Sequence, residues 1–374
     1  MDLAEERAAY VALALTPGIG AVRLAALLDR FGSALGALSA PFAFLGTVPG
    51  LTRAAASAVA NATLEQGVKA IAAAEEQGGA CLLATDPGFP AALREIPDPP
   101  PLLFVMGDLA LLGRPAVAVV GSRDNSAYGA EVCRAIAGGA AAAGLCIVSG
   151  MARGLDAAAH RAALDAGGAT IGILGNGLGV VYPAANRALY ELMAQRGLLL
   201  TEFAPGERPG LGAFPRRNRL ISGLARVTVV IEAATGSGAL ITVGTALAQG
   251  KDVMAVPGNI TSPTSVGANQ LIRDGAEPLL ELGDLLAHFE GLRRPDAPLP
   301  AGSAAAPRLD LPPLEQLLLE SLASGPGSVD QLVARSGRTA AEALAALSAL
   351  ELRGLVREER GCMVAAGPEK CLSR

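Results

Sequence analysis

Between residues 79 and 290 the sequence repeats one pattern, in which a short, largely apolar segment leads through a glycine-containing turn into a helical segment. Apolar segments without alternation are typical of strands buried on both faces, as in a parallel sheet covered by helices. The repeat therefore predicts a doubly wound α/β domain with a mostly parallel sheet, whose ligands bind outside the carboxyl ends of the strands. The expected strands are AVAVV (116–120), CIVS (146–149), TIGIL (170–174), LLLTE (198–202), VTVVIE (227–232) and DVMAVP (252–257).

Residues 1–78 are expected to form a separate helical domain. The segment LTPGIGAVRLAALLDRFGS (15–33) is typical of a helix end, a Pro-Gly hairpin and an amphipathic helix, and VPGLTRAAASAVANA (48–62) is a weaker copy. Two such units resemble paired helix-hairpin-helix motifs, whose hairpin amides contact nucleic-acid phosphates. The alternative is a compact SAM-like bundle in which the turns only cap helices, and the excess of acidic over basic residues slightly favours this bundle.

The C-terminal part predicts a linker followed by a winged helix. Residues 291–312 are rich in Pro, Ala, Gly and Ser, which is typical of a flexible linker. In the domain at 313–374, helical patterns at 313–323, 328–335 and 339–352 lead into a strand, a turn and a second strand. The expected recognition helix, 339–352, contains two Glu and no basic residue, so we interpret this domain as a protein-interaction or regulatory element.

Composition excludes several classes of protein. A net charge of −5 argues against a polybasic nucleic-acid coat, although it is compatible with a local cationic groove. Five Cys without a CxxC pair and only two His predict no disulfide framework, no metal site and no cofactor. The acidic start, and the Gly and Pro within the longest uncharged stretches, predict no signal peptide or membrane span and hence a cytoplasmic protein.

The turn after the strand at 116–120 has the ingredients of a phosphate site. Gly121 lets the backbone turn sharply, and the helix start that follows directs amide groups outward. Ser122 and Ser126 add hydroxyl groups, and Arg123 adds a planar cation. The alternative is that Ser126 only caps the helix while Arg123 pairs with a carboxylate.

The next turn repeats this arrangement with Ser149 and Gly150. Asp156 and His160 follow at i, i+4 spacing and therefore share one helical face. They form either an acid/base pair or a helix-start Asp beside a structural, hydrogen-bonded His. No Ser or Cys nucleophile accompanies them in an elbow motif, which favours the structural interpretation.

The glycine-rich segment 175–179 does not match a cofactor loop. The dinucleotide fingerprint requires a helix directly after the glycines, whereas Val-Val-Tyr-Pro follows here. We interpret the segment as a backbone turn close to the neighbouring Ser-Gly loop.

The most basic local run opens a helix at Phe214 and contains Arg216, Arg217, Asn218 and Arg219. At i, i+3 spacing Arg216 and Arg219 share one face, whereas Arg217 points elsewhere. We expect this cluster to bind an anion and Phe214 to stack on a base. The alternative is an ordinary helix start with solvated or ion-paired arginines.

A fourth turn, at 232–242, again joins a strand to a helix through glycines, and residues 233–251 contain no carboxylate. Lys251 stands just before the following strand, as either a surface cap or a phosphate contact. We count it among the nucleic-acid-binding residues.

Taken in order, these motifs closely resemble the DNA-processing protein A (DprA/Smf) family. The resemblance spans about 79–290, and the helical and winged-helix flanks fit a longer form of that family. It implies an extended Rossmann-like fold and a non-catalytic dimer that binds single-stranded DNA, protects incoming DNA in natural transformation and helps load RecA recombinase. The segments that carry it are VVGSRDNSAYG, VSGMARGLDAAAH, FPRRNRLISGLA, VVIEAATGSGALITVGTALAQGK and AVPGN…SVGANQLIRDGA.

By position, the resemblance assigns nucleic-acid contacts to two motifs. Members often carry a basic residue shortly before the Phe of the second motif, whereas residues 209–213 here are Pro-Gly-Leu-Gly-Ala. One phosphate contact is therefore missing, or Arg208 or Arg216 replaces it. The first motif falls on Gly121, Ser122, Arg123, Ser126, Tyr128 and Gly129, and the second on Phe214, Pro215, Arg217, Asn218 and Arg219.

Three other functions fit these residues less well than DNA binding does. A nucleotide N-glycosidase of the lysine-decarboxylase-like (LOG) class shares a similar sheet, but its catalytic Glu has no counterpart at 233–242. A dinucleotide-dependent oxidoreductase lacks its fingerprint, and a pure adaptor would leave the central pocket without a role.

The dimer surface is expected within 269–286. This segment has more apolar side chains than the sheet is expected to bury, so some of them would be free to contact a second copy of the chain. These side chains are Leu271, Ile272, Leu279 and Leu280.

Overall fold

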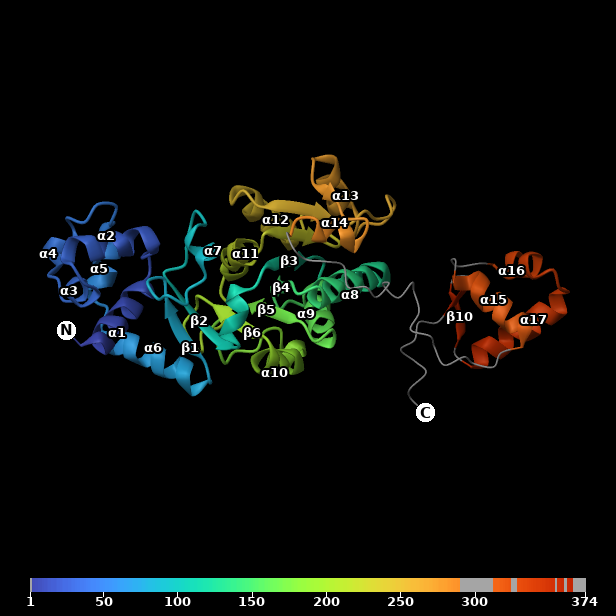
Figure 1. Cartoon of the computed structure of the whole chain (residues 1–374), viewed down its shortest axis with the longest axis horizontal. Helices are drawn as coiled ribbons and strands as arrows, with labels where there is room; N and C mark the ends of the chain where they lie inside the picture. Colours follow the sequence, from blue (N-terminus) through green and yellow to red (C-terminus); the bar gives the residue numbers. More distant parts are fainter. Residues whose placement is uncertain (1, 290–311, 324–327, 354, 360–361, 366–374) are drawn as a thin grey trace. The chain divides into compact units, whose positions relative to one another are not determined.

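The computed structural model describes residues 2–289, 312–323, 328–353, 355–359 and 362–365. The chain divides into two compact units, Met1–Leu299 and Pro300–Arg374 (Figure 1). The division falls in the expected linker, of which all but residue 312 lies outside the described residues.

The first unit is built on a nine-stranded sheet with the order β1-β2-β6-β5-β4-β3-β7-β8-β9. All pairings from β6 to β9 are parallel, whereas β1 and β2 are antiparallel additions at one edge. The predicted mostly parallel sheet is confirmed with all six expected strands, while β1, β2 and β9 were not expected. The strands are β1 (Ala80–Leu83), β2 (Leu102–Gly107), β3 (Ala116–Val120), β4 (Cys146–Ser149), β5 (Ala169–Ile173), β6 (Leu198–Thr201), β7 (Val227–Val230), β8 (Asp252–Ala255) and β9 (Glu277–Pro278).

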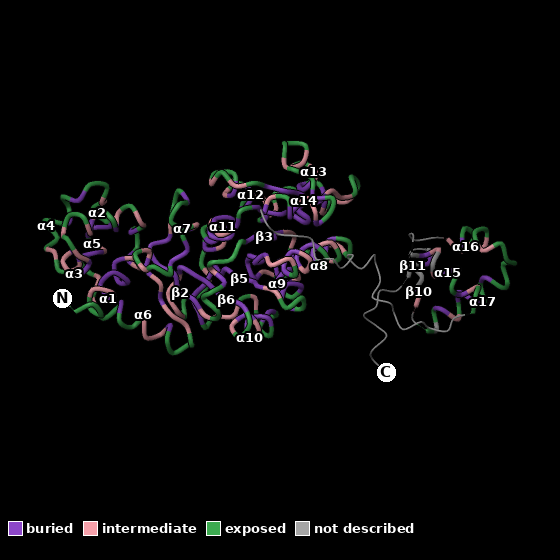
Figure 2. Tube along the Cα trace, in the orientation of Figure 1, coloured by how far each residue is buried: buried purple, intermediate pink, exposed green. Residues whose placement is uncertain are grey.

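Side chains of the central strands enter two separate cores on opposite faces of the sheet. In β3, Val117 and Val119 join the core under α8, α9 and α14, whereas Ala118 and Val120 join the core under α7, α11, α12 and α13. Both sets are buried (Figure 2), which explains why the strand is continuously apolar. These helices are α7 (Ala91–Arg94), α8 (Ala127–Ala142), α9 (Leu155–Asp165), α11 (Ala213–Leu224), α12 (Gly238–Ala248), α13 (Val266–Arg273) and α14 (Leu282–Leu286).

The order of connection reverses at β3, because β4 lies on one side of it and β7 on the other. In a doubly wound sheet this switch point leaves a crevice outside the carboxyl ends of the two strands. The turns after β3, β4 and β7 meet at this edge.

The helices before the sheet form a bundle that shares a core with the β1–β2 edge. Leu83 and Phe104 of those strands pack in one cluster with Leu13 and Leu27 of the bundle and with Tyr190 of α10. The bundle comprises α1 (Leu3–Ala14), α2 (Ala21–Phe31), α3 (Ala34–Leu38), α4 (Phe42–Leu45), α5 (Arg53–Ala60) and α6 (Leu64–Glu76), and α10 is Arg187–Arg196.

The two Pro-Gly turns of this bundle lie side by side. The Arg23 side chain donates to the carbonyl of Gly18 in the first turn, at 2.6 Å, and to that of Gly50 in the second, at 2.9 Å. The structure therefore pairs the two predicted hairpins, and their contact with nucleic acid stays a prediction.

The second unit has the three helices and two strands that its sequence predicts. Leu318, Leu332, Leu350, Val356 and Met363 lie in a core that contains no residue of the first unit. An ion pair of 2.8 Å joins Arg353 to Glu315. The elements are α15 (Pro313–Ala323), α16 (Val329–Ser336), α17 (Ala340–Leu352), β10 (Val356–Glu359) and β11 (Cys362–Ala365), and the two strands are antiparallel.

Candidate nucleic-acid interface

Backbone hydrogen bonds join the turns at the carboxyl edge of the sheet into one frame. The Ser122 amide donates to the carbonyl of Glu232 after β7, at 2.9 Å, and the Leu155 amide donates to the carbonyl of Ser122, at 3.2 Å. Gly154 lies between them with φ +76°, and a Cβ there would overlap the backbone of Ser122 and Arg123. The position of Arg123 is therefore fixed by three strands at once.

The start of α8 already holds an anion, which is the buried carboxylate of Glu232. This carboxylate accepts hydrogen bonds from the Ser126 amide at 2.9 Å, from the Ser126 hydroxyl, and from the Thr264 hydroxyl at 3.2 Å. Gly129 leaves room for it, because a Cβ there would overlap the carboxylate. The expectation that Ser126 and the amides at this helix start face a phosphate was therefore wrong.

In the turn after β4, the carboxylate of Asp156 likewise occupies the place of an anion. It accepts from the amides of Gly150, at 3.1 Å, and Ala152, at 3.4 Å. Burial raises the pKa of Asp156, and the nearby Arg217 guanidinium opposes that shift. Ser149 is fully buried and donates to the Val119 carbonyl at 2.7 Å, so its hydroxyl is also taken, contrary to expectation.

His160 has a structural environment. It is fully buried, and its Nδ1 lies 2.7 Å from the hydroxyl of Thr170, which itself donates to the Ile147 carbonyl at 2.8 Å. Burial lowers the pKa of His160 to about 3. The imidazole is therefore neutral near pH 7, as the structural interpretation requires.

The arginines at the start of α11 separate into different environments. Arg216 is exposed, lines neither cavity described below and lies 3.8 Å from Glu202, whereas Arg219 is largely buried between Glu202 at 2.7 Å and Asp98 at 3.0 Å. Arg216 and Arg219 share one side of the helix, as predicted. Arg219, however, is held in internal ion pairs, so the expectation that it is free to bind an anion was wrong.

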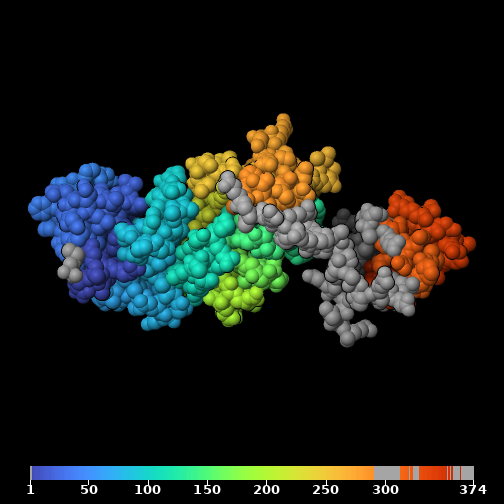
Figure 3. All heavy atoms as spheres, in the orientation of Figure 1, coloured from blue at the N-terminus to red at the C-terminus, as the bar shows by residue number. Residues whose placement is uncertain are grey.

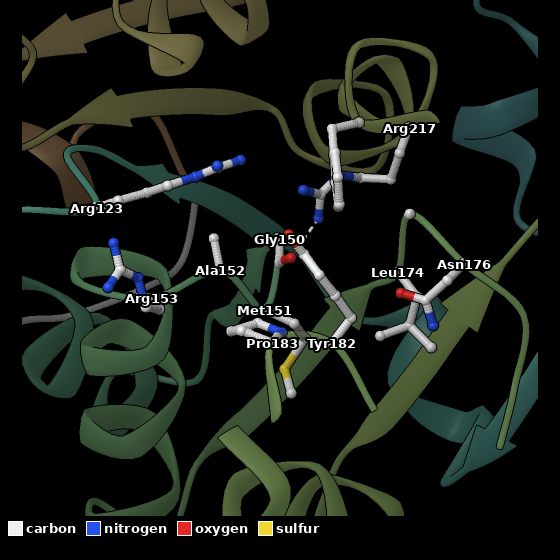
Figure 4. Close-up of a pocket in the computed structure, with 12 residues that line it drawn as sticks. Arg123, Gly150, Met151, Ala152, Arg153, Leu174, Asn176, Tyr182, Pro183 and Arg217 are labelled. Carbon is white, nitrogen blue, oxygen red and sulfur yellow. Dashed lines mark hydrogen bonds between the residues drawn. The ribbon is translucent and has the colours of Figure 1, made fainter. Parts of the chain in front are cut away.

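Arg217 reaches from α11 into a pocket (Figure 4). Its Nη1 donates to the carbonyls of Gly150 and Ile173, at the ends of β4 and β5. No ion pair to it exists among the described residues, its Nε has no hydrogen-bond partner there, and burial lowers its pKa to about 10. The neighbouring Asn218 is also buried, and its amide nitrogen is 3.5 Å from the Gly238 carbonyl.

Arg123 and Arg217 converge on the ring of Phe214. Their guanidinium carbons lie 5.7 and 6.0 Å from its centroid, within the range of a cation–π contact. Tyr182 packs on the same ring with centroids 5.4 Å apart, and Gly175 leaves room for that ring. Figure 4 shows the two arginines reaching the same pocket from the turn after β3 and from α11.

This aromatic and cationic pocket has a volume of about 220 Å³. No carboxylate is among the described residues that line it, and Arg153 at its rim pairs with Asp124 at 3.3 Å. The remaining lining residues are Gly150, Met151, Ala152, Leu174, Gly175, Asn176 and Pro183.

A second cavity of about 500 Å³ continues from this pocket over the switch point. It shares Arg123, Phe214 and Arg217 with the first and adds the turn at Gly121 and Ser122. The first turn of α12 forms its far side. Both cavities together give an elongated surface along the carboxyl edge. Asp124 and Asp156 also line this second cavity, so the excess of positive charge lies at the end that both cavities share, around Arg123 and Arg217.

Two predicted contacts lie away from this surface or at its margin. The Tyr128 hydroxyl donates to the Pro257 carbonyl at 2.9 Å, although half of the side chain is exposed. Lys251 precedes β8 and therefore lies at the opposite, amino-terminal edge of the parallel sheet, so it cannot join the phosphate site near Arg123. Tyr182 was not predicted, because the turn before it was interpreted only as backbone.

The expected dimer residues differ in exposure. Leu279 is 3% exposed because it packs in the core with α14, so the expectation that it is uncovered was wrong. Leu271 and Ile272 are half-buried, and Leu280 is 75% exposed. Figure 3 shows this segment, in orange, at the surface of the first unit.

The described part of the chain contains neither a candidate membrane span nor a candidate metal cluster. None of its helices is long and apolar enough to cross a bilayer. No group of three or more His, Cys, Asp or Glu in the same residues is arranged to hold a metal ion.

Two family models match the chain. The DNA recombination-mediator protein A model matches residues 80–290, and the DprA winged helix domain model matches residues 302–361. DNA processing protein DprA of Streptococcus pneumoniae is 47% identical over 55% of this chain and 72% of its own length. Protein Smf of Escherichia coli is 39% identical over 77% of this chain and 80% of its own.

Two solved structures agree with these matches. The X-ray structure of Streptococcus pneumoniae DprA superposes with a TM-score of 0.67 at 36% identity, covering 75% of this chain and 98% of that one. DNA processing protein A of Helicobacter pylori, whose structure concerns its single-stranded DNA binding mode, gives a TM-score of 0.52 at 30% identity. That match covers 56% of this chain and 94% of the other.

Proposed function

Because the chain belongs to the DNA recombination-mediator protein A (DprA/Smf) family, we propose that it binds single-stranded DNA without sequence preference at the carboxyl edge of its sheet. The pocket formed by Arg123, Phe214, Arg217 and Tyr182 would hold one nucleotide. The adjoining cavity would hold the phosphates that follow.

The observation that carries this proposal is the approach of two guanidinium groups to one aromatic ring, in a pocket with no carboxylate among its described lining residues; Asp156 lines only the adjoining cavity. The charge of Arg123 acts to lower the pKa of Arg217, so the two cations repel each other, and a bound anion relieves that repulsion. A phosphate diester is such an anion, and it is the same for every base.

The aromatic pair supplies the sequence-independent part of base binding. Phe214 and Tyr182 offer π-faces at the mouth of the cationic pocket, and every base can stack on such a face. A duplex keeps its bases stacked inside, so this contact favours the single strand.

The wider role follows from the family. We propose that the protein acts in the cytoplasm as a homodimer, protects incoming DNA in natural transformation and helps load RecA recombinase. The exposed Leu280 and the half-buried Leu271 and Ile272 support a dimer surface near α13. We also propose that the site binds DNA without catalysis, as the family resemblance implies.

Titration of labelled oligo-dT and of a matched duplex at two salt concentrations tests the binding proposal. We expect tighter binding to the single strand, and at least about a tenfold loss for Arg123→Ala, since a charged hydrogen bond contributes roughly 1.5–3 kcal/mol. Arg134→Ala, on the exposed side of α8, is the matched control and should bind as the wild type does. Equal affinity for both DNA forms, or an unaffected Arg123→Ala, contradicts the proposal.

The same preparation tests the glycosidase alternative. Incubation with nucleoside monophosphates should release no free base if the pocket only binds. Release of base at a rate that Arg123→Ala abolishes would assign the site to the LOG class instead.

A further inference from the structure

A second cationic hollow lies at the opposite edge of the same sheet, where the strands begin. Arg114, Arg226 and Lys251 line it, and they precede β3, β7 and β8 respectively. Because parallel strands start at one edge, three residues far apart in the sequence meet there. The hollow has a volume of about 410 Å³, and the rest of its lining is apolar, with Ala92, Pro115, Ala116, Leu224, Ala225 and Phe289.

The described part of the chain does not neutralise these cations. Arg114, Arg226 and Lys251 form no ion pair or side-chain hydrogen bond with any described residue, and no carboxylate is among the described residues that line the hollow. Lys251 also borders a neighbouring hollow that contains Asp252 and Glu277. Both of those carboxylates contact His288, at 3.3 and 2.9 Å.

The negative ends of helix dipoles offset only part of this positive charge. Helices α11 and α12 end at this edge, and each helix C-terminus carries roughly −0.5 charge, or about −1 for the two. Three full positive charges therefore leave an excess of about two. That excess favours an anionic ligand over a purely structural role.

Helix α11 connects the hollow to the nucleic-acid interface. It begins at Ala213, places Phe214 in the aromatic pocket, and ends at Leu224 beside the hollow. Its 12 residues span about 18 Å at ~1.5 Å per residue. A stacked single strand, with a phosphate every ~3.4 Å, covers this length in about five steps.

We propose that the hollow lined by Arg114, Arg226 and Lys251 is a second backbone-binding site for the single-stranded DNA that occupies the carboxyl edge. This inference rests on the proposed function. A DNA strand that leaves the aromatic pocket crosses the surface beside α11, whose residues 217–223 are buried or half-buried, and places its later phosphates among these three cations. The apolar floor accommodates the sugars between them.

Lysine acetylation tests the proposal directly, because the chain contains only Lys69, Lys251 and Lys370. The full-length protein is treated with an amine-acetylating reagent, with and without oligo-dT of about 20 nucleotides, a length within the range of single-strand binding sites. At a free oligonucleotide concentration of about ten times Kd, acetylation of Lys251 should slow about tenfold. Lys69, which is exposed and paired with Glu65 on α6, is the internal control and should not change.

A triple variant provides the second test. Arg114→Ala/Arg226→Ala/Lys251→Ala removes three phosphate contacts and should reduce the salt slope for the 20-nucleotide probe by about 2, at ~0.7 per phosphate. The matched control replaces three exposed arginines of α8, α9 and α10 and leaves the slope unchanged although the net charge is the same. Those residues are Arg134, Arg161 and Arg187.

The outcomes separate the two proposals. If oligo-dT binds in an Arg123-dependent manner while Lys251 stays reactive and the triple variant keeps the wild-type salt slope, the second site is refuted and the proposed function stands. If oligo-dT does not bind at all, both are refuted. Equal protection of Lys251 by poly-glutamate of matched charge would assign the hollow to an acidic protein segment and overturn the DNA assignment.

Discussion

At the scale of single residues, Arg217 determines the character of the site. Burying a cation costs free energy unless its N–H groups donate hydrogen bonds. Here Nη1 donates to two backbone carbonyls, whereas Nε has no hydrogen-bond partner among the described residues. The side chain is therefore fixed in place but still able to attract an anion. The nearby Asp156 carboxylate acts to raise the pKa of Arg217 without forming an ion pair with it, whereas Arg219 is ion-paired with both Glu202 and Asp98.

Gly150→Ala tests the placement of Arg217. The added Cβ would overlap the Arg217 guanidinium, so this side chain must leave its carbonyl partners. We expect affinity for oligo-dT to fall about tenfold or more, because a charged contact is lost. Fluorescence anisotropy measures it, and Gly210→Ala is the matched control, since nothing lies within 4 Å of a Cβ there. Wild-type affinity of Gly150→Ala would show that Arg217 does not contact the strand.

The sequence predicted which residue types gather at the turns but not which of them pair with one another. Arg219 meets Glu202 and Asp98, which lie 17 and 121 positions away, and no local pattern identifies such partners. Tyr182 was missed for the same reason, because only the folded loop brings it onto Phe214. Arg123, in contrast, was predicted from its turn alone, and it lies where the strand order reverses.

At the scale of elements, helix starts that resemble phosphate sites are occupied by the protein's own carboxylates. Glu232 caps α8 and Asp156 holds the turn before α9, so each replaces the anion that the motif predicted. The sequence shows the glycines and hydroxyls of such a turn, but the internal carboxylate at α8 comes from another strand. Strands are easier to predict, because burial on both faces makes them continuously apolar, and only the short or antiparallel β1, β2 and β9 were missed.

Glu232→Gln tests the internal cap of α8. The amide keeps the shape but loses the charge that accepts from Ser126 and Thr264, so we expect the free energy of unfolding to fall by about 2 kcal/mol, the range of a charge-assisted hydrogen bond. Urea unfolding measures the change. Glu131→Gln, exposed on the same helix, is the control and should leave the stability unaltered. Equal stability of both variants would show that the carboxylate is not needed at this helix start.

At the scale of the whole molecule, the two units have separate hydrophobic cores. Leu318, Leu322 and Leu332 belong to a cluster that includes no residue of the first unit, and all residues of the nucleic-acid interface and of the second hollow belong to Met1–Leu299. The sequence predicted this division from the composition at 291–312, since such segments do not build a core.

A chain that ends at Leu299 therefore tests where DNA binding resides. Since the helix expected to enter a groove, α17, has no basic residue, we expect the shortened chain to bind oligo-dT with the affinity and salt slope of the full chain. Circular dichroism should show that its first unit still melts cooperatively, because its three cores are complete without the second unit. A large loss of affinity in a chain that melts normally would mean that residues beyond Leu299 contribute phosphate contacts, and the winged helix would then need a nucleic-acid role despite its acidic helix.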